Sequence, residues 1–195
     1  MELGKGIIKK IKNNTPLRDF LLFAIVTIAF HFLYWNTNMD SWLFGPYTSK
    51  VYNFFQQIAY KGTVIFSGLF IDTPFEATYP SIKFYSLDPI SGDKNFIAIM
   101  NVVADCSGIK QLLQLFMIML VVPNKFYKRM IYFLISSIAV LFFNIVRIFI
   151  LTYVLLHHFS NYQFIHDWIG RPFHYVIIFL IWVIWMEFFA RKGKH

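Results

Sequence analysis

The sequence contains one cysteine and few charged side chains. Among its 195 residues Cys106 is the single cysteine, and only 14% of the residues are Asp, Glu, Lys or Arg. One thiol excludes an internal disulfide, and the scattered histidines do not add up to a usual metal-ligand spacing, so no metal or other cofactor is expected. The thiol is therefore either an inert, small apolar side chain or a reactive group.

Apolar residues make up most of the chain. The sequence is 57% hydrophobic and 21% aromatic, which is more apolar material than a soluble domain of this size needs for its core. This composition indicates an integral membrane protein embedded in the lipid bilayer. The net charge of +8 could indicate a nucleic-acid partner, but the basic residues lie in short blocks beside apolar runs, as in membrane proteins. Nucleic-acid binding is therefore not expected.

Four segments are apolar and long enough to cross a hydrocarbon layer of about 30 Å, which takes about 20 helical residues. They are 19–38, 97–122, 130–156 and 172–190. The sequence thus predicts an all-α, polytopic helical membrane protein. Gly170 suits the end of a helix, and Pro172 suits the first position of the last span. No internal repeat or flexible linker divides the chain, so residues 1–195 are expected to form one domain.

Basic residues predict the orientation. They cluster before the first span, in the 123–129 loop and after the last span, as Lys5, Lys9, Lys10, Lys12 and Arg18, then Lys125, Lys128 and Arg129, then Arg191, Lys192 and Lys194. Such clusters mark the cytoplasmic side, so both termini are expected there. Segment 50–71 is then a re-entrant or interfacial helix rather than a fifth crossing. Turn signals and alternating residues in 72–96 predict a small extracytoplasmic hairpin.

Arg147 lies near the middle of segment 130–156, where a charged side chain costs about 3 kcal/mol or more. Such a residue is expected to face a polar cavity or a partner. One interpretation is a structural ion pair with Asp105 or Asp167. The other is a functional role for the guanidinium.

Topology predicts that Cys106 and Arg147 meet. If their two segments are continuous, antiparallel helices, each residue lies about nine positions from the outer end of its helix, roughly 13 Å below the outer surface. His166, in "FIHDWIGRPFHY" at 164–175, is expected on the outer side above them, and His174 could also point inward. Which histidine acts is open.

A thiol, a guanidinium and a histidine brought together would support acyl transfer. The guanidinium favours the thiolate or stabilises an oxyanion, and the histidine supplies acid and base steps. Asp167 is expected either to orient His166 or to pair with Arg171. Three polar residues after the cysteine either line the cavity or satisfy one another. They are Lys110, Gln111 and Gln114.

Three short motifs occur in a fixed order: "CSGI" at 106–109, "NIVRI" at 144–148 and "HDWIG" at 166–170. Together they resemble the signatures of the exosortases and archaeosortases, over about residues 97–190. The resemblance implies a membrane-embedded cysteine protease and transpeptidase in the cytoplasmic (inner) membrane of a prokaryote, with its active site facing the extracytoplasmic side.

The resemblance also implies a substrate and residue roles. The substrates would be membrane-anchored exported proteins with a C-terminal sorting signal made of a short motif, an apolar helix and a basic tail. The enzyme would cleave at the motif and transfer the new carboxyl end to a cell-surface acceptor that the sequence does not identify. Cys106 would be the nucleophile, Arg147 the thiolate and oxyanion stabiliser, and His166 the acid and base. Many family members have around eight spans, so this chain would be a short form.

Two other classes of function stay open at this point. In a non-enzymatic membrane scaffold or assembly subunit, Cys106 would be a packing residue and Arg147 would belong to an ion pair. A small transporter is less favoured, because the sequence shows no repeated halves of the kind that many transporters have.

Overall fold

The computed structural model describes residues 15–88, 90–121 and 124–190. The helices are α2 (Thr15–Thr37), α3 (Met39–Phe44), α4 (Thr48–Phe70), α5 (Ile109–Val121), α6 (Phe126–His157), α7 (Tyr162–Phe164) and α8 (Arg171–Trp185). The strands are β1 (Phe75–Thr78), β2 (Ser81–Leu87) and β3 (Lys94–Asn101). Short 3₁₀ turns cover Gly45–Tyr47, Ala104–Cys106 and Phe159–Asn161, and π-helical turns cover Ile165–Gly170 and Met186–Ala190.

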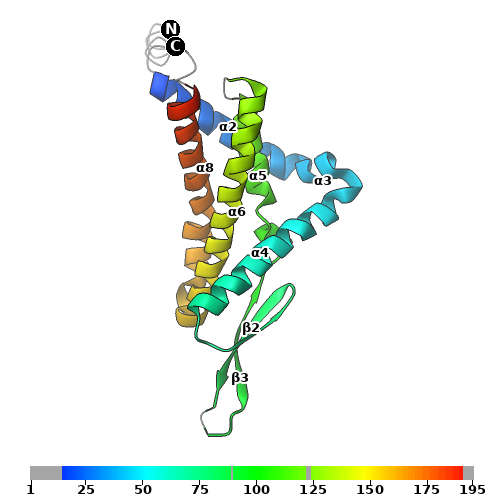
Figure 1. The fold of residues 1–195 in the computed structure, drawn as a ribbon, viewed down its shortest axis with the longest axis vertical. Coiled ribbons are helices and arrows are strands. Elements are labelled where there is room, and N and C mark those ends of the chain that lie inside the picture. Colours follow the sequence, from blue (N-terminus) through cyan, green and yellow to red (C-terminus); the bar gives the residue numbers. More distant parts are fainter. Residues whose placement is uncertain (1–14, 89, 122–123, 191–195) are drawn as a thin grey trace.

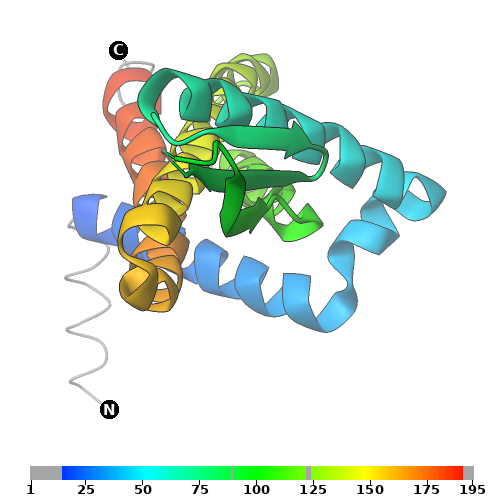
Figure 2. The ribbon, with the colours of Figure 1, turned by 90° about the horizontal axis from the view of Figure 1, so that it is seen from below.

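Two long helices, α6 and α8, run side by side along the long axis of the molecule, whereas α2 and α4 cross it obliquely (Figure 1). Seen from below, α2 and α4 lie on opposite sides and α3 joins them at one end, with the sheet in front (Figure 2). The starts of α2 and α6 and the ends of α5 and α8 share one end of the molecule, and the sheet lies at the other. The described basic clusters therefore lie away from the sheet, and the side of the membrane that each end faces stays a prediction.

Three helical segments of the described chain are long and apolar enough to cross a membrane: Leu17–Thr37, Phe126–His157 and Phe159–Phe188. They correspond to the predicted spans 19–38, 130–156 and 172–190. A shorter apolar helix, Ile109–Val121, accompanies them. The chain is thus a helical, multi-pass membrane protein. The basic residues at 5–12 and 191–194, on which the orientation also depends, lie outside the described residues.

The prediction of one helix over 97–122 is wrong. Its first part belongs to β3, a 3₁₀ turn follows, and α5 has only 13 residues. At 1.5 Å per residue α5 is about 20 Å long, too short for a hydrocarbon layer of about 30 Å. Gly108, with a φ of 83°, ends any right-handed helix before α5. An apolar strand and an apolar helix raise hydropathy alike, so the hydropathy run could not separate them.

Pro172 lies in the first turn of α8, as predicted, but the helix end predicted at Gly170 is wrong. The chain stays helical from Tyr162 into α8, through the π-helical turn Ile165–Gly170. Pro172 has no backbone N–H to donate. It follows the π turn closely, where the regular helical hydrogen-bond pattern is already interrupted, so the helix continues through it. Single π turns inside helices are frequent at functional sites, and this one contains "HDWIG".

The sheet is antiparallel, in the order β1-β2-β3. β1 and β2 lie within 72–96, where a hairpin was predicted, and β3 adds a third strand. Alternate side chains of the sheet pack with α4 and α6 in one core cluster, which includes Ile82, Phe84, Met100, Ile148 and Leu151. The extracytoplasmic placement of the sheet stays a prediction.

The segment predicted as a re-entrant or interfacial helix, 50–71, forms α4. It is one unbroken helix of 23 residues, and it does not belong to the three candidate spans of the described chain. Its depth in the bilayer stays a prediction.

Candidate active site

A cavity of about 400 Å³ opens between α2, α4, α5, α6 and the last helix. Its lining includes Cys106, Arg147, His166 and His174. The structure therefore brings together the three residues singled out in the sequence, with the second histidine beside them. The premise of a continuous helix around Cys106 is wrong, but Cys106 and Arg147 nevertheless reach one cavity. Their chemical roles stay predictions.

Cys106 ends the 3₁₀ turn that precedes α5, so the thiol lies close to a helix N-terminus. Its N–H donates to the carbonyl of Val103 at 2.9 Å. Its carbonyl accepts a 2.7 Å hydrogen bond from Nδ2 of Asn144 on α6. Helix α6 thereby fixes the backbone of the cysteine.

Gly108 makes this arrangement possible. A Cβ at Gly108 would lie 3.2 Å from Nδ2 of Asn144, in addition to requiring a positive φ. Cys106, Gly108 and Asn144, which lies one turn before Arg147, therefore form one packed unit. The sequence shows Asn144 only as a neighbour of Arg147 on one helix; its bond to the cysteine backbone needs the tertiary structure.

The electrostatics of Cys106 combine two opposing effects. Burial raises the pKa of its thiol, and the guanidinium of Arg147 counteracts this rise by attracting the thiolate. The carboxylate of Asp105 adds a smaller upward effect on the pKa. The pKa of the thiol lies above its ordinary value even with Arg147 present. The thiol therefore needs a base to react at neutral pH.

Arg147 is 8% exposed, and its Nε has no hydrogen-bond partner among the residues that the structure describes. Within residues 15–88, 90–121 and 124–190, no ion pair joins Arg147 to Asp105 or Asp167. Asp167 is instead engaged by His166 and Arg171. The described contacts thus do not support the structural ion pair. They leave the guanidinium facing the cavity.

His166 lies in the π-helical turn and is held by the residue after it. Its Nδ1 donates to the Asp167 carboxylate at 2.9 Å, because a carboxylate can only accept. The same carboxylate accepts from Nε2 of Gln163 and pairs with Arg171 at 3.4 Å. Both predicted roles of Asp167 therefore occur together. With Nδ1 engaged, Nε2 of His166 is left for proton transfer, as in other carboxylate–histidine pairs.

His174 lies two turns further along the same helix and is 3% exposed. Neither of its ring nitrogens hydrogen-bonds another described side chain. Both histidines thus reach the cavity, but only His166 has a carboxylate that orients its ring.

The opposite wall of the cavity was not predicted. The hydroxyls of Tyr34 and Tyr52 are 2.7 Å apart, and Tyr52 donates to Asp40 at 2.9 Å. Nζ of Lys110 lies 4.2 Å from the ring centroid of Trp35. Lys110, Gln111 and Gln114 line the cavity, which was one of their two predicted roles. In the sequence, these aromatic residues look like the belt of Tyr and Trp side chains that many membrane proteins have at the membrane surface. Nothing therefore indicated that α2 and α4 contribute a wall of the cavity.

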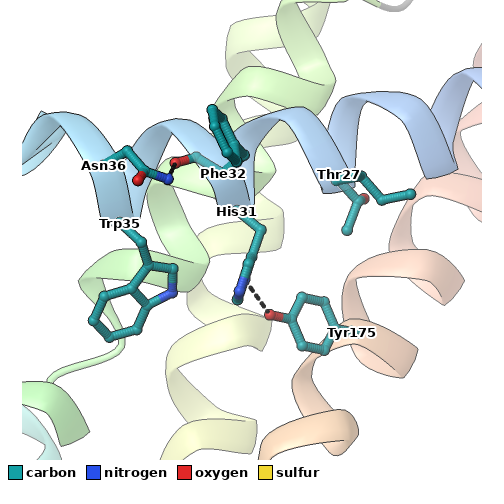
Figure 3. A pocket seen from close by; sticks show the side chains of 7 residues that line it. Thr27, His31, Phe32, Trp35, Asn36 and Tyr175 are labelled. Atoms are coloured by element: carbon teal, nitrogen blue, oxygen red, sulfur yellow. Dashed lines mark hydrogen bonds between the residues drawn. The ribbon is translucent and has the colours of Figure 1, made fainter.

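An open groove of about 690 Å³ adjoins the cavity on the α2 side. Thr27, His31 and Trp35 project toward it from α2 and Tyr175 from α8, with a 3.2 Å hydrogen bond joining the Tyr175 hydroxyl to Nδ1 of His31 (Figure 3). His31, Trp35 and Tyr175 line the cavity as well. The groove and the cavity therefore meet along these three side chains.

Comparison with protein families gives a match over residues 15–183, to the transmembrane exosortase family (Exosortase_EpsH). Neither a curated protein nor a solved structure matches the chain. The family match includes all of the cavity described above.

Proposed function

Because the chain belongs to the transmembrane exosortase family, we propose that it is a membrane-embedded cysteine transpeptidase. It cleaves C-terminal sorting signals of exported proteins and transfers them to a cell-surface acceptor. The observation that carries this proposal is the shared cavity of Cys106, Arg147 and His166, into which Arg147 projects without an ion-pair partner in the described chain. The groove along α2 suits the apolar helix of a sorting signal, because it is open and meets the cavity.

The first half of the reaction forms a thioester. His166 accepts the proton of the Cys106 thiol, and the thiolate attacks the scissile carbonyl carbon of the substrate. Arg147 stabilises the thiolate and then the oxyanion of the tetrahedral intermediate. When the C–N bond breaks, His166 returns the proton to the leaving amine. The product is an acyl group on the sulfur and a released C-terminal peptide.

The second half regenerates the thiol. His166 removes a proton from the acceptor nucleophile, which attacks the thioester carbonyl, and the C–S bond breaks. The sulfur leaves as a thiolate that Arg147 again stabilises, and it then takes the proton from His166. Polar side chains on the first turns of α5 give the acceptor a hydrophilic part of the cavity to enter. Of the α5 side chains that line the cavity, those of Lys110 and Gln111 are nearest to Cys106 in the sequence.

The thioester itself provides the test of this function. The purified enzyme in lipid vesicles is mixed with a reporter protein that ends in a cognate sorting signal, without acceptor, and quenched in acid. We expect mass spectrometry to find the N-terminal reporter fragment attached to Cys106, and neutral hydroxylamine to release it. Cleavage of the reporter without any modification of Cys106 would contradict the proposal.

Gly170 offers a second test, because it lets the π-helical turn approach Arg147. A Cβ at this position would lie 3.3 Å from Nε of Arg147 and 3.4 Å from the carbonyl of Ile165. Gly170→Ala should displace the guanidinium by a few tenths of an ångström and lower kcat/KM about tenfold, since catalysis depends steeply on geometry. Gly68→Ala is the matched control, because a Cβ there meets only Phe75, at 3.8 Å. Equal activity of the two variants would show that the close approach is unimportant.

A further inference from the structure

The outer edge of β3 is open. Among the described residues, β3 pairs with β2 alone, and β1 lies at the other edge of the sheet. Helix α6 packs against the core-facing side chains of β3, and Gln56 of α4 donates to the carbonyl of Val102 just past its end, so these helices leave the outer backbone groups of the strand unpaired. The turn after β1 lies against α4. There Tyr79, in the turn after β1, packs edge-on against Tyr60 and donates to Asn53. An uncovered strand edge presents unpaired N–H and C=O groups to any extended chain, so most proteins protect it.

The register shows which backbone groups face outward. The N–H of Val102 donates to the carbonyl of Pro80, so Val102 points toward the β2 side. Backbone groups alternate along a strand, so Met100 also points to β2, whereas Ile99 and Asn101 point away from it. Within the described residues, the N–H and C=O groups of Ile99 and Asn101 have no partner.

The usual protective devices are missing from this edge. β3 contains no proline, and its single lysine, Lys94, lies at the far end of the strand and pairs with Glu76 at 2.7 Å. Three apolar side chains of β3 are exposed instead, at 59% for Phe96, 44% for Ile97 and 38% for Ile99. An edge of this kind, rich in apolar side chains, suits the addition of a strand.

The strand also leads directly to the cysteine. β3 ends at Asn101, Val103 lines the cavity, and Cys106 follows within the next 3₁₀ turn. A chain that pairs with Ile99 and Asn101 would therefore run along the strand toward the thiol. Main-chain pairing would hold the substrate extended, which is the form in which a scissile carbonyl is accessible.

We propose that the open edge of β3 binds the extended segment of the substrate next to the cleavage site as a fourth strand and delivers its scissile carbonyl to Cys106. This rests on the proposed function. Main-chain hydrogen bonds supply binding that depends little on sequence, and the exposed side chains of β3 contact every second residue of the substrate.

Proline substitutions test the edge. Ile99→Pro removes an outward N–H but no bond to β2, and we expect KM for the reporter to rise about fivefold or more. Ala77→Pro is the matched control: Pro74 accepts from the N–H of Tyr85, so Ala77 points away from β2 on the opposite edge. Ala77→Pro should stay near wild type, whereas Ile99→Ala, which keeps the N–H but loses a side chain that contacts the substrate, should raise KM less than Ile99→Pro does. Alkylation of Cys106 by a small thiol reagent should be unchanged in all three variants.

Cross-linking gives a second measurement that does not depend on the folding of the proline variant. In the Cys106→Ala background, a single cysteine is placed at Ile99 or at Ala77, and the reporter carries a cysteine at successive positions before the cleavage site. Oxidation should link position 99 to the reporter position that faces it, with only weak linking two residues to either side, and should link position 77 to none.

The outcomes separate the two proposals. If the wild type cleaves the reporter but Ile99→Pro has an unchanged KM, or position 99 links only to a second copy of the enzyme, the edge proposal is wrong and the transpeptidase stands. If the wild type cleaves no sorting-signal reporter, the proposed function is wrong and the edge proposal falls with it.

Discussion

Cys106→Ala is expected to abolish cleavage of a sorting-signal reporter, by a factor on the order of 10⁴ or more, because the thioester cannot form without the sulfur. The fold should tolerate the change. The side chain is only partly buried and packs at the margin of the core between the sheet and α6, so its loss should cost about 1 kcal/mol of unfolding free energy or less. The measurement is reporter cleavage by the enzyme in vesicles, beside its thermal unfolding temperature.

Cys106→Ser is the control for this prediction. Serine has nearly the same shape, but one guanidinium cannot ionise a hydroxyl near neutral pH, so this variant should also be inactive while folding normally. A scaffold in which the cysteine only packs would keep its full activity with either substitution. Undiminished cleavage by Cys106→Ala would therefore reject the enzymatic assignment.

Arg147→Met is expected to lower kcat/KM by about 10²- to 10³-fold, the size of effect seen when an oxyanion donor is removed. The same variant should unfold at an equal or higher temperature. Arg147 is buried, and in the described part of the chain its Nε has no hydrogen-bond partner and its charge has no carboxylate partner. The substitution therefore removes a buried charge without leaving a described carboxylate unpaired. Loss of activity with a gain in stability distinguishes a functional arginine from a structural one. A loss of stability of several kcal/mol would restore the ion-pair interpretation.

The pH dependence of Cys106 alkylation gives an independent measurement for Arg147. Burial raises the pKa of the thiol, and Arg147 counteracts that rise. The alkylation rate of the wild type should therefore increase with pH up to a pKa above that of a free thiol. In Arg147→Met this inflection should move to still higher pH, because the thiolate loses its cation. Arg147→Lys should lie between the two, since a lysine keeps a charge but can lose its proton when buried. An unmoved inflection would show that Arg147 does not act on the sulfur.

The parts of the site that could be predicted are those whose signal lies in a single residue. A guanidinium in the middle of an apolar helix is costly, so Arg147 by itself indicates a polar cavity. The lone thiol, preceded by Asp105 and followed by Ser107 and Gly108, stands out because polar and helix-weakening residues surround it in an apolar run. Cys106 and Arg147 lie at equal distances from the outer ends of their predicted spans, which predicts that they meet. Both do line one cavity, although the helix assumed around the cysteine is wrong.

The parts that could not be predicted depend on how the backbone is folded between these residues. "FIAIM" in β3 is apolar enough to extend a helical span, and only the pairing with β2 makes it a strand. The glycine of "HDWIG" suits a helix end, yet it lies inside a helix, because a π turn changes the register and Gly170 allows close contact with Arg147. Tyr52 enters the cavity through the bend between α2 and α4, and bends of this kind leave no periodic signature.

The groove along α2 has a kinetic consequence. A substrate whose C-terminal apolar helix entered this groove would approach the thiol by lateral diffusion in the lipid bilayer. Its soluble domain would stay in water throughout. Encounters confined to a plane depend on the amount of each protein per area of membrane rather than per volume. The hydrogen bond between His31 and Tyr175 lies where the groove and the cavity meet. A substrate that diffuses in the plane of the membrane would pass it on entering the cavity.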